Sequence, residues 1–168
     1  EQNTFTAVNQ MWIKGHYNYR RPDVLLFITG LPVVFIELKK ATVKVEEAYH
    51  KNLLSYRKDI PNIFAFNQIC VLSNGLETRL GAWSASYDYF FEWLKVDNEK
   101  EKINRKAIAE HDTSVINLID GLLRKDRLLD YIENFVFFDR GNKIIAKNHQ
   151  YLGVNNLVEA TRNREDLQ

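Results

Sequence analysis

Three charged residues mark the two ends of the most hydrophobic hairpin in the chain. Asp23 opens the first apolar run, and Glu37 and Lys39 close the second. Side chains alternate between the faces of a strand, so Glu37 and Lys39 share one face. Two adjacent carboxylates repel unless a cation neutralises them, and Mg²⁺ binds through one or two carboxylates together with water and phosphate oxygens. These residue types suit metal-dependent hydrolysis of a phosphodiester, with Lys39 orienting water or neutralising developing negative charge.

The turn of this hairpin decides whether Asp23 joins that face. An odd loop such as Thr29-Gly30-Leu31 places Asp23 directly opposite Glu37. A two-residue Gly30-Leu31 loop pairs Asp23 with Leu38 and sends it to the other face, although a β-bulge can restore the pairing. The competing interpretation is structural: a turn cap at Asp23 and a Glu37–Lys39 salt bridge at a strand end.

The apolar pattern predicts the elements that must position these residues. Two nearly continuous apolar runs, 23–29 and 33–39, are expected as strands at the centre of a sheet with both faces covered. Helical spacing predicts a helix over 46–58. Further strands are expected at 5–12, 63–72 and 77–83. An Asn74-Gly75 hairpin joins the last two, so the order is β, β-hairpin, α, β, β.

The second half of the chain has a helical character. Residues 95–112 carry dense mixed charge and are expected as a solvated helix face or connector. Apolar residues recur at helical spacing from 115 to 138, where Gly121 is expected to divide two helices that form core or a docking surface. Residues 138–143 are expected as a turn, and 150–164 as a final helix.

Composition limits the class of protein. The 168 residues suffice for one domain with a sizeable core, and a net charge of +1 gives no overall basic signature, so any DNA contact must be local. The single cysteine, Cys70, excludes an internal disulfide and favours a reducing, cytoplasmic setting. We expect no membrane span and no signal segment. The chain opens on Glu1, which suggests a piece excised from a larger protein.

The charged hairpin also resembles a known motif. Pro22-Asp23 followed by Glu37-Leu38-Lys39 resembles the PD-(D/E)xK nuclease motif, and the whole stretch 21–40 is similar to the nuclease segment of the R subunit of type I restriction–modification enzymes. That family carries Gln-x-x-x-Tyr on the following helix; Asn52 and Tyr56 occupy these positions here, with Asn in place of Gln. The stretches 66–81 and 134–160 resemble later segments of the same family.

The resemblance implies a role for each matched residue. Asp23 and Glu37 would hold Mg²⁺ or Mn²⁺, and Lys39 would be the catalytic lysine. Tyr56, together with Asn52, would support the site or contact the DNA backbone. Gln150 is similar to the adenine-reading glutamine that precedes the ATP site of helicase-like motors. Independently of the family, three basic residues flank the hairpin and are candidates for holding DNA phosphates: Arg20, Arg21 and Lys40. For the two arginines, an ordinary solvated turn is an equally good interpretation.

The implied fold is α/β, a restriction-endonuclease-like mixed sheet flanked by helices and followed by a helical C-terminal extension. The endonuclease domain is expected over 1–140, with a core at 1–95 and the extension at 96–140. Residues 141–168 would form a junction into a helicase-like motor beyond Gln168. No G-x-x-x-x-G-K-[ST] loop occurs in the chain, so ATP would be bound by that motor. A helix that usually precedes the first strand is expected upstream of Glu1.

The expected function is that of a Mg²⁺-dependent endonuclease domain acting on double-stranded DNA. In the family, cleavage follows ATP-driven translocation, and the partners are the specificity and methylation subunits and the protein's own motor. Two alternatives stay open. One is a non-catalytic module of the same fold that couples the motor to its partner subunits, and the other is a repair or recombination nuclease that shares the motif.

Overall fold

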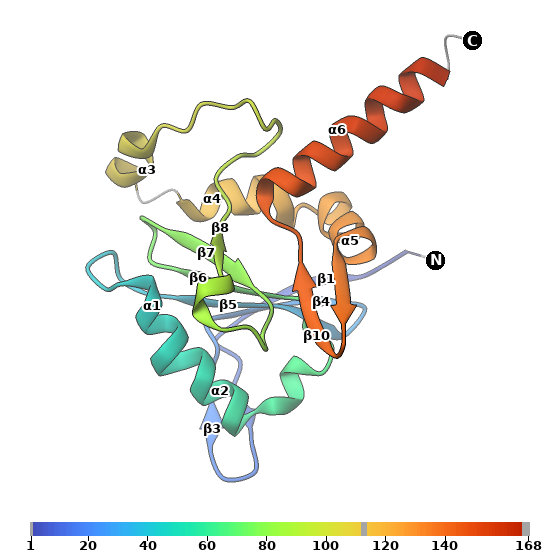
Figure 1. Ribbon diagram of the computed structural model, residues 1–168. Helices are drawn as coiled ribbons and strands as arrows, with labels where there is room; N and C mark the ends of the chain where they lie inside the picture. The colour runs from blue at the N-terminus through green and yellow to red at the C-terminus, as the bar shows by residue number, and fades with distance from the viewer. Residues whose placement is uncertain (1, 112–113, 166–168) are drawn as a thin grey trace.

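A six-stranded sheet lies at the centre of the molecule (Figure 1). The computed structural model describes residues 2–111 and 114–165. The strands lie in the order β1-β4-β5-β6-β7-β8, with β5 and β6 parallel and the other neighbours antiparallel. Their bounds are β1 Phe5–Asn9, β4 Val24–Ile28, β5 Leu31–Leu38, β6 Ile69–Ser73, β7 Thr78–Gly81 and β8 Phe91–Glu92. The expected mixed sheet is confirmed, and both strands of the hairpin β4–β5 are interior strands of it.

Two predicted strands are shorter than expected. The first strand ends at Asn9, because Gln10 takes a positive φ of 48° that breaks the extended backbone. The strand predicted from residue 63 begins only at Ile69. Residues Pro61–Phe64 form a 3₁₀ helix instead, since proline at its first turn presets a helical φ.

One face of the sheet is covered by a continuous helical stretch, which confirms the helix predicted at 46–58. It consists of α1 (Val45–Glu47), the π-helical segment η1 (Ala48–Leu53) and α2 (Leu54–Asp59). Its apolar side packs on side chains that point to this face of the sheet. Members of this cluster include Leu25, Phe35, Leu53, Tyr56 and Leu72. The π-helical turn was not predicted from the apolar spacing.

The opposite face is covered by the C-terminal half of the chain (Figure 1). Its elements are α4 (Ser114–Leu118), the π-helical η4 (Ile119–Leu123), α5 (Lys125–Asn134), β9 (Val136–Asp139), β10 (Asn142–Ile145) and α6 (Asn148–Glu165). Buried side chains of these elements pack on Val34 and Ile36 of β5. The apolar stripe is therefore core, and the domain boundaries at 96 and 141 stay predictions.

The division between the two predicted helices does not fall at Gly121. The break comes at Arg124, whose ψ of 143° is extended. Gly121 lies within η4, where glycine is needed for lack of space: a Cβ at this position would lie 2.5 Å from Nε1 of the buried Trp93. In the mixed-charge stretch, α3 (Arg105–His111) is helical, and Asp112 lies outside the described residues. The turn predicted at 138–143 is shorter than expected, since only Arg140 and Gly141 connect β9 to β10 and the other four residues lie in these strands.

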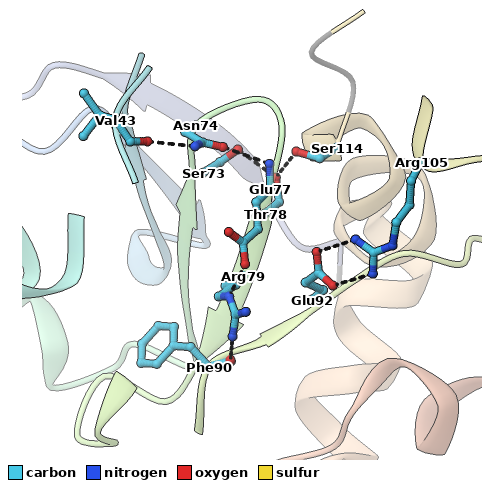
Figure 2. A network of polar contacts seen from close by, with 10 residues as sticks. All are labelled: Val43, Ser73, Asn74, Glu77, Thr78, Arg79, Phe90, Glu92, Arg105 and Ser114. Carbon is cyan, nitrogen blue, oxygen red and sulfur yellow. Dashed lines mark hydrogen bonds and ion pairs between the residues drawn. The ribbon is translucent and has the colours of Figure 1, made fainter. Parts of the chain in front are cut away.

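Polar contacts connect the turn between β6 and β7 to the C-terminal half, as Figure 2 shows. The Thr78 hydroxyl lies 2.7 Å from that of Ser73 and 2.8 Å from that of Ser114. Asn74 accepts a hydrogen bond from the Glu77 amide through its side chain, so the predicted hairpin is confirmed. These contacts join α4 to the sheet edge.

A second, two-stranded hairpin precedes the central one. It consists of β2 (Ile13–Lys14) and β3 (Tyr19–Arg20), in a segment that the sequence indicated as a turn. Across the described ranges 2–111 and 114–165, no helix has the length and apolar character needed to span a membrane.

Candidate active site

The turn of the central hairpin is a two-residue loop. Ile28 pairs with Leu31, so Thr29 and Gly30 form the connection. Both have positive φ, 48° and 83°, as a type I′ turn requires. Neither of the loops considered from the sequence is formed. Without any irregularity, this loop would place Asp23 opposite Ile36 and away from the face of Glu37.

A β-bulge corrects the register. The pairing shifts between Leu26 and Phe27, so that Val33 is the extra residue and Val24 pairs with Ile36. One residue further along, Asp23 therefore lies opposite Glu37. The bulge is the third of the arrangements that the sequence allowed, and it brings the two carboxylates to the same face of the sheet.

The structure brings Asp23, Glu37 and Lys39 together at one end of β4 and β5. The Lys39 Nζ lies 3.0 Å from Oε1 of Glu37. The Leu38 amide donates a 2.8 Å hydrogen bond to Oδ2 of Asp23, which fixes that carboxylate beside the strand. The backbone amide of Lys39 donates a 2.7 Å hydrogen bond to the carbonyl of Ser73, which fixes the backbone of Lys39 beside β6. The catalytic and metal-binding roles of these residues stay predictions.

Glu37 is a buried carboxylate with an unsatisfied oxygen. Its residue surface is 2% exposed, and Oε2 has no hydrogen-bond partner among the described residues. Burial raises the pKa of Glu37 from its ordinary value of 4.5 to about 7, the Lys39 hydrogen bond opposes this, and the charge of Asp23 raises it further. A buried polar atom without a partner is uncommon and indicates a missing ligand such as an ion or a water.

Tyr56 and Asn52 lie on the helical stretch that covers this face. The Tyr56 hydroxyl donates to the Arg21 carbonyl at 3.3 Å, and its ring packs edge-on against Phe35. Burial and the negative charge of Glu37 raise the pKa of Tyr56, whereas Asn52 lies close enough to the hydroxyl to lower it. Asn52 belongs to the π-helical segment, a distortion often found at functional sites.

The three basic residues predicted to bind DNA differ in their surroundings. Arg20 is clamped by Asp59, which accepts from its Nε at 2.6 Å and lies 2.5 Å from its Nη2. This ion pair lowers the pKa of Asp59. Arg21 and Lys40 are exposed, and the Arg21 guanidinium stacks over Trp12 at 5.1 Å. The Asp59 clamp joins residues 39 positions apart, so no local sequence signal indicates it.

Gln150 lies apart from the carboxylates. It is in the first turn of α6, where its Oε1 accepts from the Lys147 amide at 2.8 Å. The side chain lines a hollow together with Tyr89 and Lys143, and neither carboxylate of the candidate site lines it. Its nucleotide-binding role stays a prediction.

The donor set fits a single hard cation. Within the described part of the chain, no group of three or more histidine, cysteine, aspartate or glutamate side chains could hold a metal ion. An ion would therefore depend on Asp23 and Glu37, with its other ligands from water and substrate, as Mg²⁺ commonly binds. Glu37 Oε2 is the oxygen that such an ion would satisfy.

Comparison with known proteins shows which family the chain resembles. A family model described as "Type I restriction enzyme R protein N terminus" matches residues 1–89. The chain is 36% identical over 168 residues to the type I restriction enzyme HindI endonuclease subunit of Haemophilus influenzae, an alignment that covers 95% of this chain and 16% of that subunit. It is 33% identical over 177 residues to a putative type I restriction enzyme MjaIXP endonuclease subunit of Methanocaldococcus jannaschii, with 95% and 17% covered. The chain thus spans about one sixth of the length of these relatives.

Proposed function

Because the chain belongs to the type I restriction enzyme R protein family and matches the N terminus of that protein, we propose that it is the DNA-cleaving part of such an enzyme. The substrate is double-stranded DNA, and the reaction is hydrolysis of a phosphodiester bond. The observation that carries the proposal is the unsatisfied, buried Oε2 of Glu37 on the same sheet face as Asp23, with Lys39 between this site and solvent.

We place one Mg²⁺ or Mn²⁺ ion on Asp23 and Glu37. When bound, such an ion polarises a phosphoryl oxygen and lowers the pKa of a bound water. Asp23 is positioned for this by the Leu38 amide, which holds one of its oxygens. Glu37 must lose its proton to bind, so the ion would offset the effect of burial that raises its pKa.

Lys39 supplies positive charge at the reacting phosphate. Its side chain is 21% exposed, whereas that of Glu37 is 3% exposed, so the ammonium lies on the solvent side of the pair. A cation on Glu37 would take over the neutralisation of this carboxylate. The Lys39 ammonium is then available to stabilise charge that develops on the phosphate or to orient the attacking water.

The supporting residues act through position. Tyr56 donates to the Arg21 carbonyl, which precedes Pro22-Asp23, and so joins the covering helix to the start of β4. Arg21 and Lys40 are exposed and lie beyond the carboxylates at the same end of the hairpin, where we expect them to hold phosphates of the bound strand.

Coupling to other parts of the enzyme completes the proposal. The curated relatives are about six times longer than this chain, so ATP-driven translocation is assigned to a motor in the remainder of the protein. Specificity and methylation subunits would select the DNA, and a cytoplasmic setting stays a prediction. In this scheme the present chain cuts without reading sequence.

Calorimetric titration of the metal-free chain with Mn²⁺ tests the metal site. We expect one ion to bind and Asp23→Asn or Glu37→Gln to weaken it by more than the roughly 10- to 100-fold that follows from losing an outer-shell partner. Glu47→Gln is the matched control, since it removes a carboxylate on α1 that is paired with Lys51. Mn²⁺ binding that is absent, or equal in all variants, would instead favour a non-catalytic module that couples the motor to its partner subunits.

A further inference from the structure

The small hairpin β2–β3 presents an outward face made of aromatic and basic side chains. Lys14 pairs with Tyr19 across the two strands. Two positions further from the turn, Trp12 and Arg21 lie opposite each other, with the guanidinium 5.1 Å from the indole centroid. Alternation along the strands puts these four residues on the same face. Trp12 is 65% exposed and Tyr19 60% exposed, so both rings are open to solvent.

The inward face of the hairpin is anchored to the body of the protein. Ile13 packs against the cluster beneath α2, and Arg20 is held by Asp59 at the end of that helix. Asn18 also donates to Asp59, at 3.3 Å. The backbone of the hairpin lies directly against the end of α2, since a Cβ at Gly15 would lie 1.9 Å from the Asp59 carbonyl oxygen. The aromatic side chains therefore project from a fixed platform.

Charge on this segment has one sign. Between Gln2 and Pro22 the sequence has three lysine or arginine residues and no aspartate or glutamate, although the whole chain has a net charge of only +1. Arg20 is neutralised by Asp59, which leaves Lys14 and Arg21 as the cations of the outward face. A polyanion complements this face, whereas a typical protein surface of mixed charge does not.

The platform continues directly into the candidate active site. Arg21 and Asp23 are two residues apart in the sequence, so their Cα atoms lie at most about 7 Å apart. This is close to the spacing of neighbouring nucleotides in an extended strand. A phosphate held at Asp23 and Glu37 would therefore place the adjoining nucleotides of the same strand over Arg21 and Trp12.

We propose that the outward face of β2–β3 is a stacking platform for unpaired bases next to the scissile phosphate. Trp12 and Tyr19 provide flat surfaces on which purines and pyrimidines both stack, and Lys14 and Arg21 contact the phosphate backbone of the DNA. The inference rests on the proposed function and deepens it, because it names a locally unpaired strand as the form of DNA that this surface holds. Stacking requires no base-edge hydrogen bonds, which agrees with a nuclease part that reads no sequence.

Binding to the chain in EDTA tests the platform independently of catalysis. The probes are a labelled single strand of about 20 nucleotides, longer than the ~4–16 that one fold covers, an abasic strand of the same length, and the blunt duplex. We expect the base-bearing strand to bind more tightly than the abasic strand. Trp12→Ala or Tyr19→Ala should each weaken its binding roughly ten-fold and reduce the preference for the base-bearing strand over the abasic strand. Lys14→Ala should lower the salt dependence by ~0.7 in log–log slope.

Controls separate stacking from other effects. Tyr89→Ala removes an aromatic side chain that is 74% exposed on another part of the surface and should not change binding. Bases that stack on Trp12 should quench its fluorescence when DNA binds. Trp12→Phe should preserve affinity yet lose this quenching, because the other two tryptophans cannot stack on bases in the same way: Trp93 is buried and Trp83 is stacked on Phe64. All binding is measured in EDTA, where no metal-dependent cleavage takes place, so failure of the nuclease assignment would not alter this result.

Three results would overturn the inference. Parent-like affinity in both Trp12→Ala and Tyr19→Ala would remove the aromatic residues from the interface. Equal binding of base-bearing and abasic strands would reduce the contact to phosphate attraction. A parent chain that binds none of the DNA probes would make the hairpin a docking surface for protein.

Discussion

Replacing Lys39 by alanine is expected to lower DNA cleavage by the full-length enzyme by roughly 100- to 1,000-fold, the loss typical of removing one donor that stabilises transition-state charge. The Lys39 ammonium lies 3.0 Å from Glu37 at the mouth of the site, where the phosphate must approach. Its loss also leaves the buried Glu37 without its hydrogen-bond donor, so the carboxylate should become harder to ionise. ATP hydrolysis should be unchanged, because the motor is assigned to another part of the enzyme.

Lys51→Ala is a matched control for this substitution. Lys51 is also paired with a glutamate on the same side of the sheet, Glu47, but its side chain is 71% exposed. The measurement follows conversion of supercoiled plasmid to linear product beside ATP turnover in the same reaction. Undiminished cleavage in Lys39→Ala, or an equal loss in Lys51→Ala, would remove the ammonium from the proposed chemistry.

The stability of the metal-free chain should fall as pH rises from about 4.5 to about 7, and Glu37→Gln should remove this dependence. The pKa of Glu37 is raised from 4.5 to about 7 in the folded protein, so between these values the folded state holds a proton that the unfolded state has lost. Stability then decreases with pH, by about 3 kcal/mol in total, because one pKa unit corresponds to ~1.4 kcal/mol. Below pH 4.5 the free energies of unfolding of the parent and of Glu37→Gln should differ by an amount that does not change with pH.

Urea denaturation across this pH range measures the difference between parent and variant. Glu47→Gln should remove a contribution to stability that depends on pH in the opposite sense, since Lys51 lowers the pKa of Glu47. The Glu47 contribution is present above its ordinary pKa and is lost as pH falls. Parallel stability curves for the parent and Glu37→Gln would show that Glu37 ionises normally, and the explanation of its unsatisfied oxygen would then be wrong.

The sequence predicted part of the site from strand alternation alone. Glu37 and Lys39 are two residues apart on one strand, so their common face follows from local geometry. The position of Asp23 does not follow, because it depends on an extra residue, Val33, that lies within a run of apolar β-formers. Nothing in the residue types of that run marks which of them forms the bulge.

The remaining differences have similar causes. The hairpin β2–β3 has only two residues in each strand and is stabilised by Asp59, a residue distant in sequence. The residue propensities of such a polar segment indicate a turn, but the long-range contact with Asp59 stabilises a short hairpin instead. Ile63 and Phe64 are apolar enough to open a strand, yet Pro61 favours a helical start and both side chains reach the core from a 3₁₀ helix.

The most direct test of the central claim is cleavage by the full-length enzyme carrying Asp23→Asn. Asparagine keeps an oxygen that can accept from the Leu38 amide, so the hairpin end should keep its geometry while the negative charge is lost. The account predicts normal ATP turnover and no linear DNA in the presence of Mg²⁺. Cleavage at the parent rate would contradict the assignment of Asp23 and Glu37 as a shared metal site.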